Sequence, residues 1–215
     1  MPLTEKTFAQ GLLCLARDDP DLAKILSDWG PPPMWVRPPG FATLLLIILE
    51  QQVSLASARA AFHRLRATVT RVTPRRVLAL DDATLKAVGF SRQKAAYARH
   101  LAAAIVERRF RPALLPRMSD EAARETLTAL KGIGPWSAEI YLLMALRRPD
   151  VWPQHDLALA SAAQRVKQLG ARPTPDDLNA LAAAWTPWRA VAARLLWHDY
   201  LSNRAQRRGK TPKGT

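Results

Sequence analysis

Helix-capping residues stand in front of Ala- and Leu-rich segments along most of this 215-residue chain. Thr73, Asp81, Ser91 and Ser119 each precede such a segment. Side chains of these types are preferred at helix N-caps because they accept hydrogen bonds from the first backbone N–H groups. Val and Ile are sparse and do not alternate with polar residues over the length of a strand. The pattern therefore predicts an all-α protein.

The longer helices are expected at about residues 4–16, 20–29, 41–50 and 55–70. Thr174-Pro175 and Thr186-Pro187 each offer an N-cap and a first-turn proline for the last two helices. Between the second and third helices, GPPPMWVRPPG at 30–40 contains five prolines. Because proline blocks helix formation, this segment predicts an extended connector.

The charge of the chain points to a polyanionic partner. Lys and Arg number 32 against 18 Asp and Glu, which gives a net charge of +14 and a pI near 11.0. Nucleic acid is the expected partner. A membrane surface is the alternative, but no segment pairs a basic face with a large aromatic face. The longest apolar run, FATLLLIIL, is far shorter than the roughly 20 residues that span a bilayer, so we expect no membrane association and a cytoplasmic location.

Cysteine usage excludes several kinds of site. Cys14 is the one cysteine in the sequence. A single cysteine cannot form an intrachain disulfide or supply a cysteine-based zinc or iron–sulfur centre. We therefore expect no iron–sulfur cluster.

The segment LKGIGPW at 130–136 has the form of a hairpin between two helices. The first glycine can end a helix in a conformation that other residues resist, and the second allows the backbone to approach a ligand closely. The next helix then presents its first N–H groups to an anion. We expect Gly132, Gly134, Ser137 and Ala138 to contact a DNA phosphate. An ordinary helix–helix turn is the alternative.

Asp156 follows Trp136 by twenty residues. The helix PWSAEIYLLMALRR extends about 20 Å, and PDVWPQHD then breaks and turns back, so that Asp156 can return to the mouth of the hairpin. The carboxylate would sit at the N-terminus of the next helix, where the dipole favours negative charge. The alternative is that Asp156 serves only as an N-cap.

These motifs together resemble the signature of the helix–hairpin–helix DNA glycosylases. LKGIGPWSAEIYLLMALRRPDVWPQHD carries the hairpin, the Pro and the Asp at the family's separation. ILEQQVSLASARA at 48–60, WTPWRAVAARLLW at 185–197 and WGPPPMWVRPPGFATLL are similar to segments of the alkylbase branch, DNA-3-methyladenine glycosylase II. The resemblance covers about residues 18–200.

The resemblance implies a two-lobed all-α fold with a cleft that holds a flipped nucleotide. One helix–hairpin–helix glycosylase domain would span 1–203, with one lobe at about 41–132 and the other at 1–40 plus 133–203. Residues 204–215, which contain no acid, would form a basic disordered tail.

Asp156 matches the family's catalytic aspartate. His155 stands where relatives often have an acid, and we assign it no role. Trp136 and Trp188 match tryptophans of the base pocket, with Trp35 and Tyr141 as further candidates. The alternative for the large aromatic residues is packing in the core. Gln52, in QQVS, matches the residue that fills the gap left by the flipped base, with Gln51 or Val53 nearby. The alternative is that these residues form only a polar junction between two helices.

The chemistry suits these residue types. Alkylation at N3 of adenine or N7 of guanine leaves a positively charged base, which is a good leaving group and is attracted to indole faces. Departure of the base makes the sugar cationic, and a carboxylate stabilises that charge. Bifunctional relatives carry a lysine at the position of Trp136, so the resemblance implies a monofunctional enzyme without AP lyase activity.

No cofactor is expected to be required. Family hairpins can hold Na⁺ or K⁺ on backbone carbonyls, which here would be those of Thr128, Leu130 and Ile133. The expected activity is hydrolysis of the N-glycosidic bond of alkylated purines in double-stranded DNA by a monomer. Two alternatives are a non-catalytic module that binds DNA structure and a glycosylase for deaminated or oxidised bases.

Overall fold

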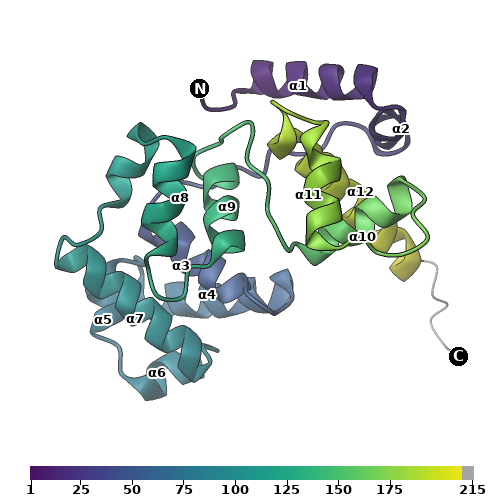
Figure 1. The fold of residues 1–215 in the computed structure, drawn as a ribbon. Coiled ribbons are helices and arrows are strands. Elements are labelled where there is room, and N and C mark those ends of the chain that lie inside the picture. Colours follow the sequence, from purple (N-terminus) through teal and green to yellow (C-terminus); the bar gives the residue numbers. More distant parts are fainter. Residues whose placement is uncertain (210–215) are drawn as a thin grey trace, which may run out of the picture. The chain divides into compact units, whose positions relative to one another are not determined.

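The computed structural model describes residues 1–209, in which every regular element is a helix, as the sequence predicted (Figure 1). The elements in chain order are α1 (Glu5–Asp18), α2 (Pro20–Trp29), α3 (Phe41–Glu50), α4 (Leu55–Val69), α5 (Pro74–Leu78), α6 (Asp82–Ala87), α7 (Arg92–Val106), the 3₁₀ helix η1 (Pro112–Arg117), α8 (Asp120–Thr128), α9 (Pro135–Met144), α10 (Leu157–Val166), α11 (Pro175–Ala183) and α12 (Arg189–Gly209).

The helices form two compact units. Unit 1 comprises residues 1–35 and the chain from 147 onward, and it holds α1, α2, α10, α11 and α12. Unit 2 is the continuous segment 36–146, with α3 to α9. Figure 1 shows both sets of helices, coloured along the chain. Unit 2 is therefore an insertion in the sequence of unit 1.

The core of unit 2 forms around α3. This helix is apolar on nearly all sides and contacts α4, α7 and α9, as expected for a helix buried all round. Its last residue, Glu50, is buried, and its two carboxylate oxygens accept hydrogen bonds from both terminal nitrogens of Arg37, each at 2.8 Å. A bidentate pair satisfies a buried carboxylate well.

The core of unit 1 forms around α12, which contacts α1, α2, α10 and α11. Indole N–H groups donate to two of its buried carboxylates. Trp29 Nε1 donates to Asp199 at 3.1 Å, and Trp185 Nε1 donates to Asp19 at 2.8 Å. The two chain segments of unit 1 are also joined at their ends, where Leu3 N donates to the carbonyl oxygen of Arg147 at 2.6 Å.

The limits of the units differ from the lobes expected at 41–132 and at 1–40 plus 133–203. Helix α9 packs on α3 and α8 and so belongs to unit 2. Residues 36–40 also belong to unit 2, because Arg37 N donates to Met144 O and Gly40 N donates to the hydroxyl of Tyr141. The segment that follows the hairpin is thus part of the same unit as the hairpin itself.

Two helix ends also correct the expectations from sequence. The last helix begins at Arg189 rather than behind Thr186-Pro187, a peptide bond that is cis. That helix continues to Gly209, so residues 204–209 are helical and not a disordered tail. The rest of the expected tail, 210–215, lies outside the described residues.

Among residues 1–209, no helix is both long enough and apolar enough to cross a membrane.

Candidate active site

Asp156 is the N-cap of α10. Its Oδ1 accepts hydrogen bonds from the backbone N–H groups of Ala158 and Leu159, both at 2.9 Å. The residue is only 9% exposed, and the carboxylate lies at the positive end of the helix dipole, which stabilises negative charge. The capping role considered from sequence is confirmed. The same contacts fix the direction of the carboxylate.

A tryptophan that sequence reasoning did not single out lies beside this carboxylate. Trp197 Nε1 donates to Asp156 Oδ1 at 3.3 Å, and the Trp197 side chain is buried. Trp197 lies on α12, which packs along α10. The signal that could have found it is the final tryptophan of WTPWRAVAARLLW, a motif in which only Trp188 had been considered.

Trp35 lies next to Trp197. The two ring centroids are 6.5 Å apart with an interplanar angle of 72°, an edge-to-face arrangement. The His198 ring lies at the same centroid distance from Trp35. Trp35 ends the first part of the proline-rich connector and has φ of 47°. The structure therefore brings Trp35, Trp197 and Asp156 together within unit 1.

Arg194 fixes the backbone that leads into Trp35. Its Nε donates to the carbonyl oxygen of Met34 at 2.7 Å, and its Nη1 donates to Ala190 O at 2.8 Å. The guanidinium also lies over the ring of Phe8, 5.8 Å from the centroid. Burial lowers the pKa of Arg194 to about 10. This buried side chain ties the connector to α12.

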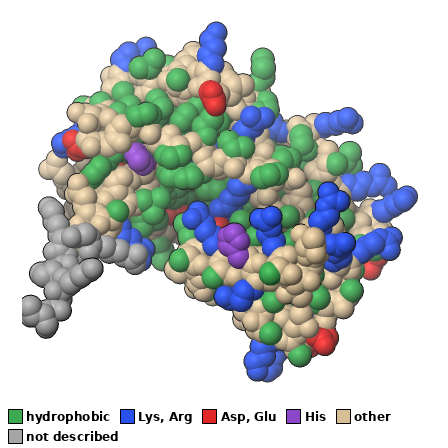
Figure 2. Space-filling model, turned by 180° about the vertical axis from the view of Figure 1, so that it is seen from behind, with side chains coloured by type: hydrophobic (Ala, Val, Ile, Leu, Met, Phe, Trp, Pro, Cys, Tyr) green, Lys and Arg blue, Asp and Glu red, His purple; other side chains and the backbone are tan. Residues whose placement is uncertain are grey.

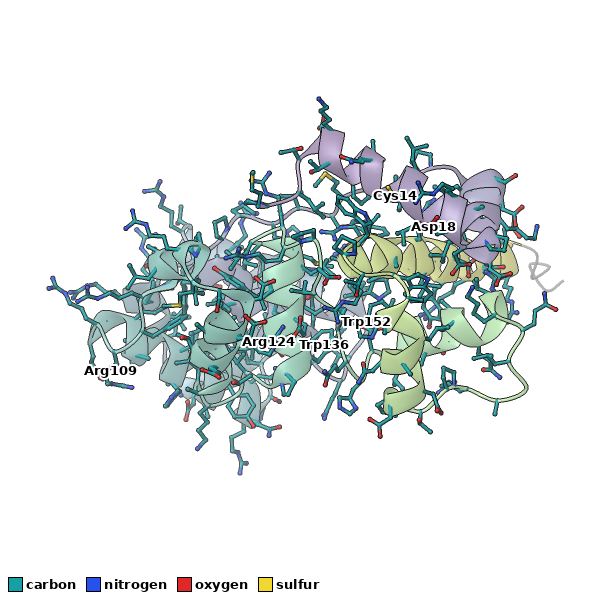
Figure 3. The ribbon with its side chains drawn as sticks, turned by 45° about the horizontal axis from the view of Figure 1, so that its top comes forward. Cys14, Asp18, Arg109, Arg124, Trp136 and Trp152 are labelled. Carbon is teal, nitrogen blue, oxygen red and sulfur yellow. The ribbon has the colours of Figure 1, made fainter. Side chains whose placement is uncertain are left out.

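The structure places Trp188 elsewhere in unit 1. A Cβ built on Gly11 of α1 would lie 2.9 Å from Cε3 of Trp188, so the indole packs directly on the Gly11 backbone. Trp188 also lines a small cavity of about 60 Å³ together with Cys14 and Asp18, which Figure 3 shows on α1. This position supports a packing role, and its expected contact with a base stays a prediction.

The two hairpin glycines in unit 2 have different reasons to be glycine. Gly132 has φ of 92°, and a Cβ there would lie 2.3 Å from Cγ of Tyr97, so both conformation and packing exclude a side chain. Gly134 has φ of −91°, and its Cβ position faces open space. Neither conformation nor packing inside the described structure demands glycine at 134.

The first turn of α9 meets only part of the expectation. The N-cap Gly134 supplies no side-chain hydrogen bond, so the first N–H groups of α9 receive no cap from that residue. Ser137 is buried, and its Oγ accepts a hydrogen bond from Gln51. The N–H of Ala138 donates to Gly134 O at 3.0 Å. The backbone donor of Ala138 is thus already used inside the helix, and its expected phosphate contact stays a prediction that this hydrogen bond does not support.

Trp136 and Tyr141 lie on the same helix in different settings. Trp136, labelled in Figure 3, is half-buried in the first turn of α9. Tyr141 is fully buried, its hydroxyl accepts a hydrogen bond from Gly40 N at 2.8 Å, and burial raises its pKa. A ring enclosed in this way packs the core of unit 2 and offers no face to a base, so the structure does not support the expected pocket role of Tyr141.

The loop Gln51–Ser54 between α3 and α4 is here called the wedge loop. Its two glutamines lie in different environments. Gln52 is exposed and has φ of 56°. Val53 and Leu55 beside it are 45% and 43% exposed. Gln51 is half-buried and points to the hairpin, where it donates to Gly132 O and Ser137 Oγ. Of the two, Gln52 is the side chain presented outward.

The expected cation ligands lie where α8 ends and the hairpin begins. The carbonyl of Leu130 accepts the N–H of Ile133 at 3.0 Å, and a carbonyl keeps a second lone pair. The carbonyl of Thr128 stands at the C-terminal end of α8, where the helix dipole is negative. Carbonyl oxygens are the ligand type that Na⁺ and K⁺ take, and the expected cation site stays a prediction.

An all-helical chain with this hairpin, followed by a helix-capping aspartate, falls in the helix–hairpin–helix class of DNA-binding proteins. Residues 45–188 match the family described as HhH-GPD superfamily base excision DNA repair protein, and the chain belongs to that family. The resemblance recognised in the sequence is confirmed.

Curated relatives carry alkylbase names. DNA-3-methyladenine glycosylase 1 of Schizosaccharomyces pombe is 28% identical over 185 residues, which is 82% of this chain and 79% of the relative. DNA-3-methyladenine glycosylase 2 of Escherichia coli is 32% identical over 126 residues, which is 59% of this chain and 42% of the relative. The chain also spans only 44% of YfjP of Bacillus subtilis, to which it is 33% identical over 126 residues, 59% of this chain.

Solved structures of the same kind share the fold. The Schizosaccharomyces pombe 3-methyladenine DNA glycosylase Mag1, in complex with abasic DNA, superposes with a TM-score of 0.75 at 26% identity, covering 84% of this chain and 89% of that one. A DNA-3-methyladenine glycosidase from Bacillus halodurans gives 0.73 at 27% identity, covering 93% and 91%.

Proposed function

We propose that this protein is a DNA repair glycosylase that hydrolyses the N-glycosidic bond of alkylated purines of the 3-methyladenine and 7-methylguanine type. The observation that carries the proposal is the Asp156 carboxylate, fixed at the start of α10 and hydrogen-bonded by Trp197, in a member of the HhH-GPD family. The names of the relatives and the abasic DNA bound to Mag1 support this substrate class.

Little acid catalysis is needed at the base. An N3- or N7-alkylated purine already carries the positive charge that protonation would otherwise have to supply. Its flat, cationic ring is attracted to the face of an indole by roughly 0.5–2 kcal/mol, depending on desolvation. Trp35 and Trp136 are half-buried, and they are the indoles that we propose contact the base.

Catalysis must mainly stabilise the sugar, which becomes cationic as the base departs. A carboxylate whose direction is already set costs no reorganisation at that moment. Asp156 meets this requirement, because its Oδ1 is held by two backbone N–H groups and by the Trp197 indole. The same carboxylate can orient and deprotonate the attacking water.

DNA is held without reading its sequence. Figure 2 shows many Lys and Arg side chains and few acidic ones on the face turned to the viewer. Gly134 leaves room for a phosphate at the N-terminus of α9, and Na⁺ or K⁺ on the carbonyls of Thr128, Leu130 and Ile133 would add positive charge there. Gln52 enters the duplex where the nucleotide is flipped out. The protein acts as a monomer on double-stranded DNA.

The proposed enzyme is monofunctional. Strand cleavage by related enzymes requires a lysine that forms a Schiff base, and Trp136 occupies that position here. We expect intact abasic sites in the product and no covalent enzyme–DNA adduct after borohydride treatment. A strongly trapped adduct would show that another amine acts as a nucleophile.

The function is tested with duplexes that each contain one lesion: 7-methylguanine, 3-methyladenine, hypoxanthine or 8-oxoguanine. Single-turnover base release should be fast for the alkylated bases and abolished or nearly so in Asp156→Asn. Removing one preorganised electrostatic group costs about 10²–10³ in rate. The amide oxygen of Asn still caps α10, so the fold is preserved.

Asp81→Asn is the matched control, since Asp81 caps α6 in the same manner, with its side chain accepting from Thr84 N. It should leave the rate unchanged. Binding to lesions without release of any base would favour a DNA-structure-binding module. Preferential release of hypoxanthine or 8-oxoguanine would favour the other class of glycosylase.

A further inference from the structure

Lys94 holds the backbone at the start of the wedge loop. From α7, its Nζ donates to the carbonyl oxygen of Leu49 at 2.6 Å and to that of Gln51 at 2.8 Å. These carbonyls lie at the C-terminal end of α3, where the dipole favours a cation. The Gln51 carbonyl belongs to the peptide unit that leads into Gln52. Fixing that plane fixes the direction in which Gln52, with φ of 56°, leaves the loop.

The side chain of Gln51 runs in the opposite direction, to the hairpin. Its Nε2 donates to Gly132 O at 2.8 Å and to Ser137 Oγ at 2.8 Å. Because a carbonyl can only accept, the amide nitrogen must face Gly132. An amide is the uncharged side chain that offers two N–H donors from one atom. Both donors are used, one on Gly132 of the hairpin and one on Ser137 in the first turn of α9.

These contacts join three segments that lie far apart in sequence: the wedge loop, α7 and the hairpin. The hydrogen bonds of Gln51 span 81 and 86 residues, and those of Lys94 span 45 and 43. All of them lie inside unit 2. Ser137 is 3% exposed, so its contact with Gln51 is shielded from water, and such a buried polar network is rigid when its groups are satisfied.

We propose that Gln51 and Lys94 are positioning residues that form a lock, in which Gln51 joins the wedge loop to the hairpin and Lys94 joins the backbone of that loop to α7. The lock fixes the position of the outward Gln52 side chain relative to the hairpin backbone that we propose binds a phosphate. Loss of the lock leaves the hairpin able to bind DNA but lowers the efficiency with which Gln52 stabilises a flipped nucleotide. This inference rests on the proposed function, in which Gln52 enters the duplex.

The test separates DNA binding, flipping and base release in Gln51→Met, which keeps the length of the side chain but removes both donors. Affinity for an undamaged duplex is measured by fluorescence anisotropy. Flipping is measured by the fluorescence of 2-aminopurine placed next to 7-methylguanine. We expect affinity within twofold of wild type, and a loss of about tenfold in the flipping equilibrium and in the single-turnover rate. Gln10→Met, at an exposed position of α1, should change none of these.

A double-mutant cycle with Gln52→Ala distinguishes positioning from general stabilisation. If Gln51 acts through Gln52, then Gln51→Met lowers the flipping signal by less than twofold once Gln52 is Ala. Lys94→Met should behave in the same way as Gln51→Met. Losses that multiply in the double variant overturn the proposal, and so does failure of both Gln51→Met and Lys94→Met to fold.

The outcome is distinguishable from failure of the proposed function. A wild-type protein that flips the nucleotide but releases no alkylated base contradicts the proposed activity. The double-mutant cycle measured by 2-aminopurine fluorescence still tests whether Gln51 and Lys94 position Gln52. A wild-type protein that produces no fluorescence change overturns the lock, because Gln52 then stabilises no flipped nucleotide.

Discussion

The indole nitrogen of Trp197 donates to Oδ1 of Asp156 at 3.3 Å, across 41 residues of sequence. The oxygen that receives this bond is the same one that caps α10. One carboxylate oxygen thus joins the first turn of α10 to the middle of α12. The contact links the stability of this helix pair to the direction of the group that we propose stabilises the cationic sugar.

Trp197→Phe should slow base release by about tenfold, because a hydrogen bond to a charged group is worth roughly 1.5–3 kcal/mol and this one is long. Single-turnover rates on a 7-methylguanine duplex measure the change. Trp29→Phe is the matched control, since it removes an indole bond to a different carboxylate of unit 1, Asp199. The control should lower the melting temperature but keep the rate. Equal rates of base release in Trp197→Phe and wild type would show that the indole N–H does not contribute to catalysis.

The hairpin glycines should fail in different ways. Gly132→Ala forces a left-handed alanine against Tyr97, and the backbone cost of about 1–2 kcal/mol alone lowers the melting temperature of a protein of this size by several degrees. Gly134→Ala meets no internal contact and should fold normally. Its binding to damaged and undamaged duplexes should weaken by similar factors, as measured by anisotropy. Normal DNA binding by Gly134→Ala would show that no phosphate approaches this backbone.

Substitutions of two tryptophans of unit 1 should have different effects, one on the selectivity for charged bases and the other on the stability of the fold. Trp35→Leu should lower the ratio of 7-methylguanine to hypoxanthine release rates by about two- to thirtyfold, the equivalent of the cation–π energy. Trp188→Leu should leave that ratio unchanged and lower the melting temperature, because the indole packs on Gly11. Single-turnover rates on the two lesions and thermal melts provide the comparison. A changed ratio in Trp188→Leu, with normal stability, would restore Trp188 as a base contact.

Stability should depend on pH through Asp19. Burial opposes ionisation of Asp19, but hydrogen bonds from Lys167 Nζ at 2.6 Å and Trp185 Nε1 at 2.8 Å outweigh it, so the pKa is lowered. A depressed carboxyl pKa adds stability that is present above the unfolded value of about 3.9 and is lost as the pH falls through the folded value. Melting temperatures at pH of about 7 and about 3 should therefore differ less in Asp19→Asn than in wild type.

Local signals predicted the helices well. Asp19 and Pro20 mark the start of Pro20–Trp29, and the proline-rich connector that follows this helix separates it from Phe41–Glu50. The predicted start of the last helix was wrong, because Thr186-Pro187 carries the same capping signal but does not begin a helix. Capping preferences describe a residue and its near neighbours, and they do not report the conformation that tertiary contacts impose.

The candidate site was predictable only in part. Asp156 could be found because the hairpin, helix and aspartate follow one another in the chain. Trp197 could not be separated from Trp188, since both lie in one motif and only the packing of α10 against α12 decides which indole reaches the carboxylate. The burial of Tyr141 likewise depends on Gly40, 101 residues earlier. Such contacts are long-range and leave no local pattern.

The insertion of unit 2 within the sequence of unit 1 sets an order for synthesis on the ribosome. Helices α1 and α2 emerge first, but the helix that buries them, α12, starts only at Arg189. Unit 2 emerges as one uninterrupted segment and can enclose α3 before the remainder of unit 1 exists. Once Leu146 has left the ribosome, the nascent chain can therefore carry a completed unit 2, while the apolar sides of α1 and α2 are not yet covered by α12.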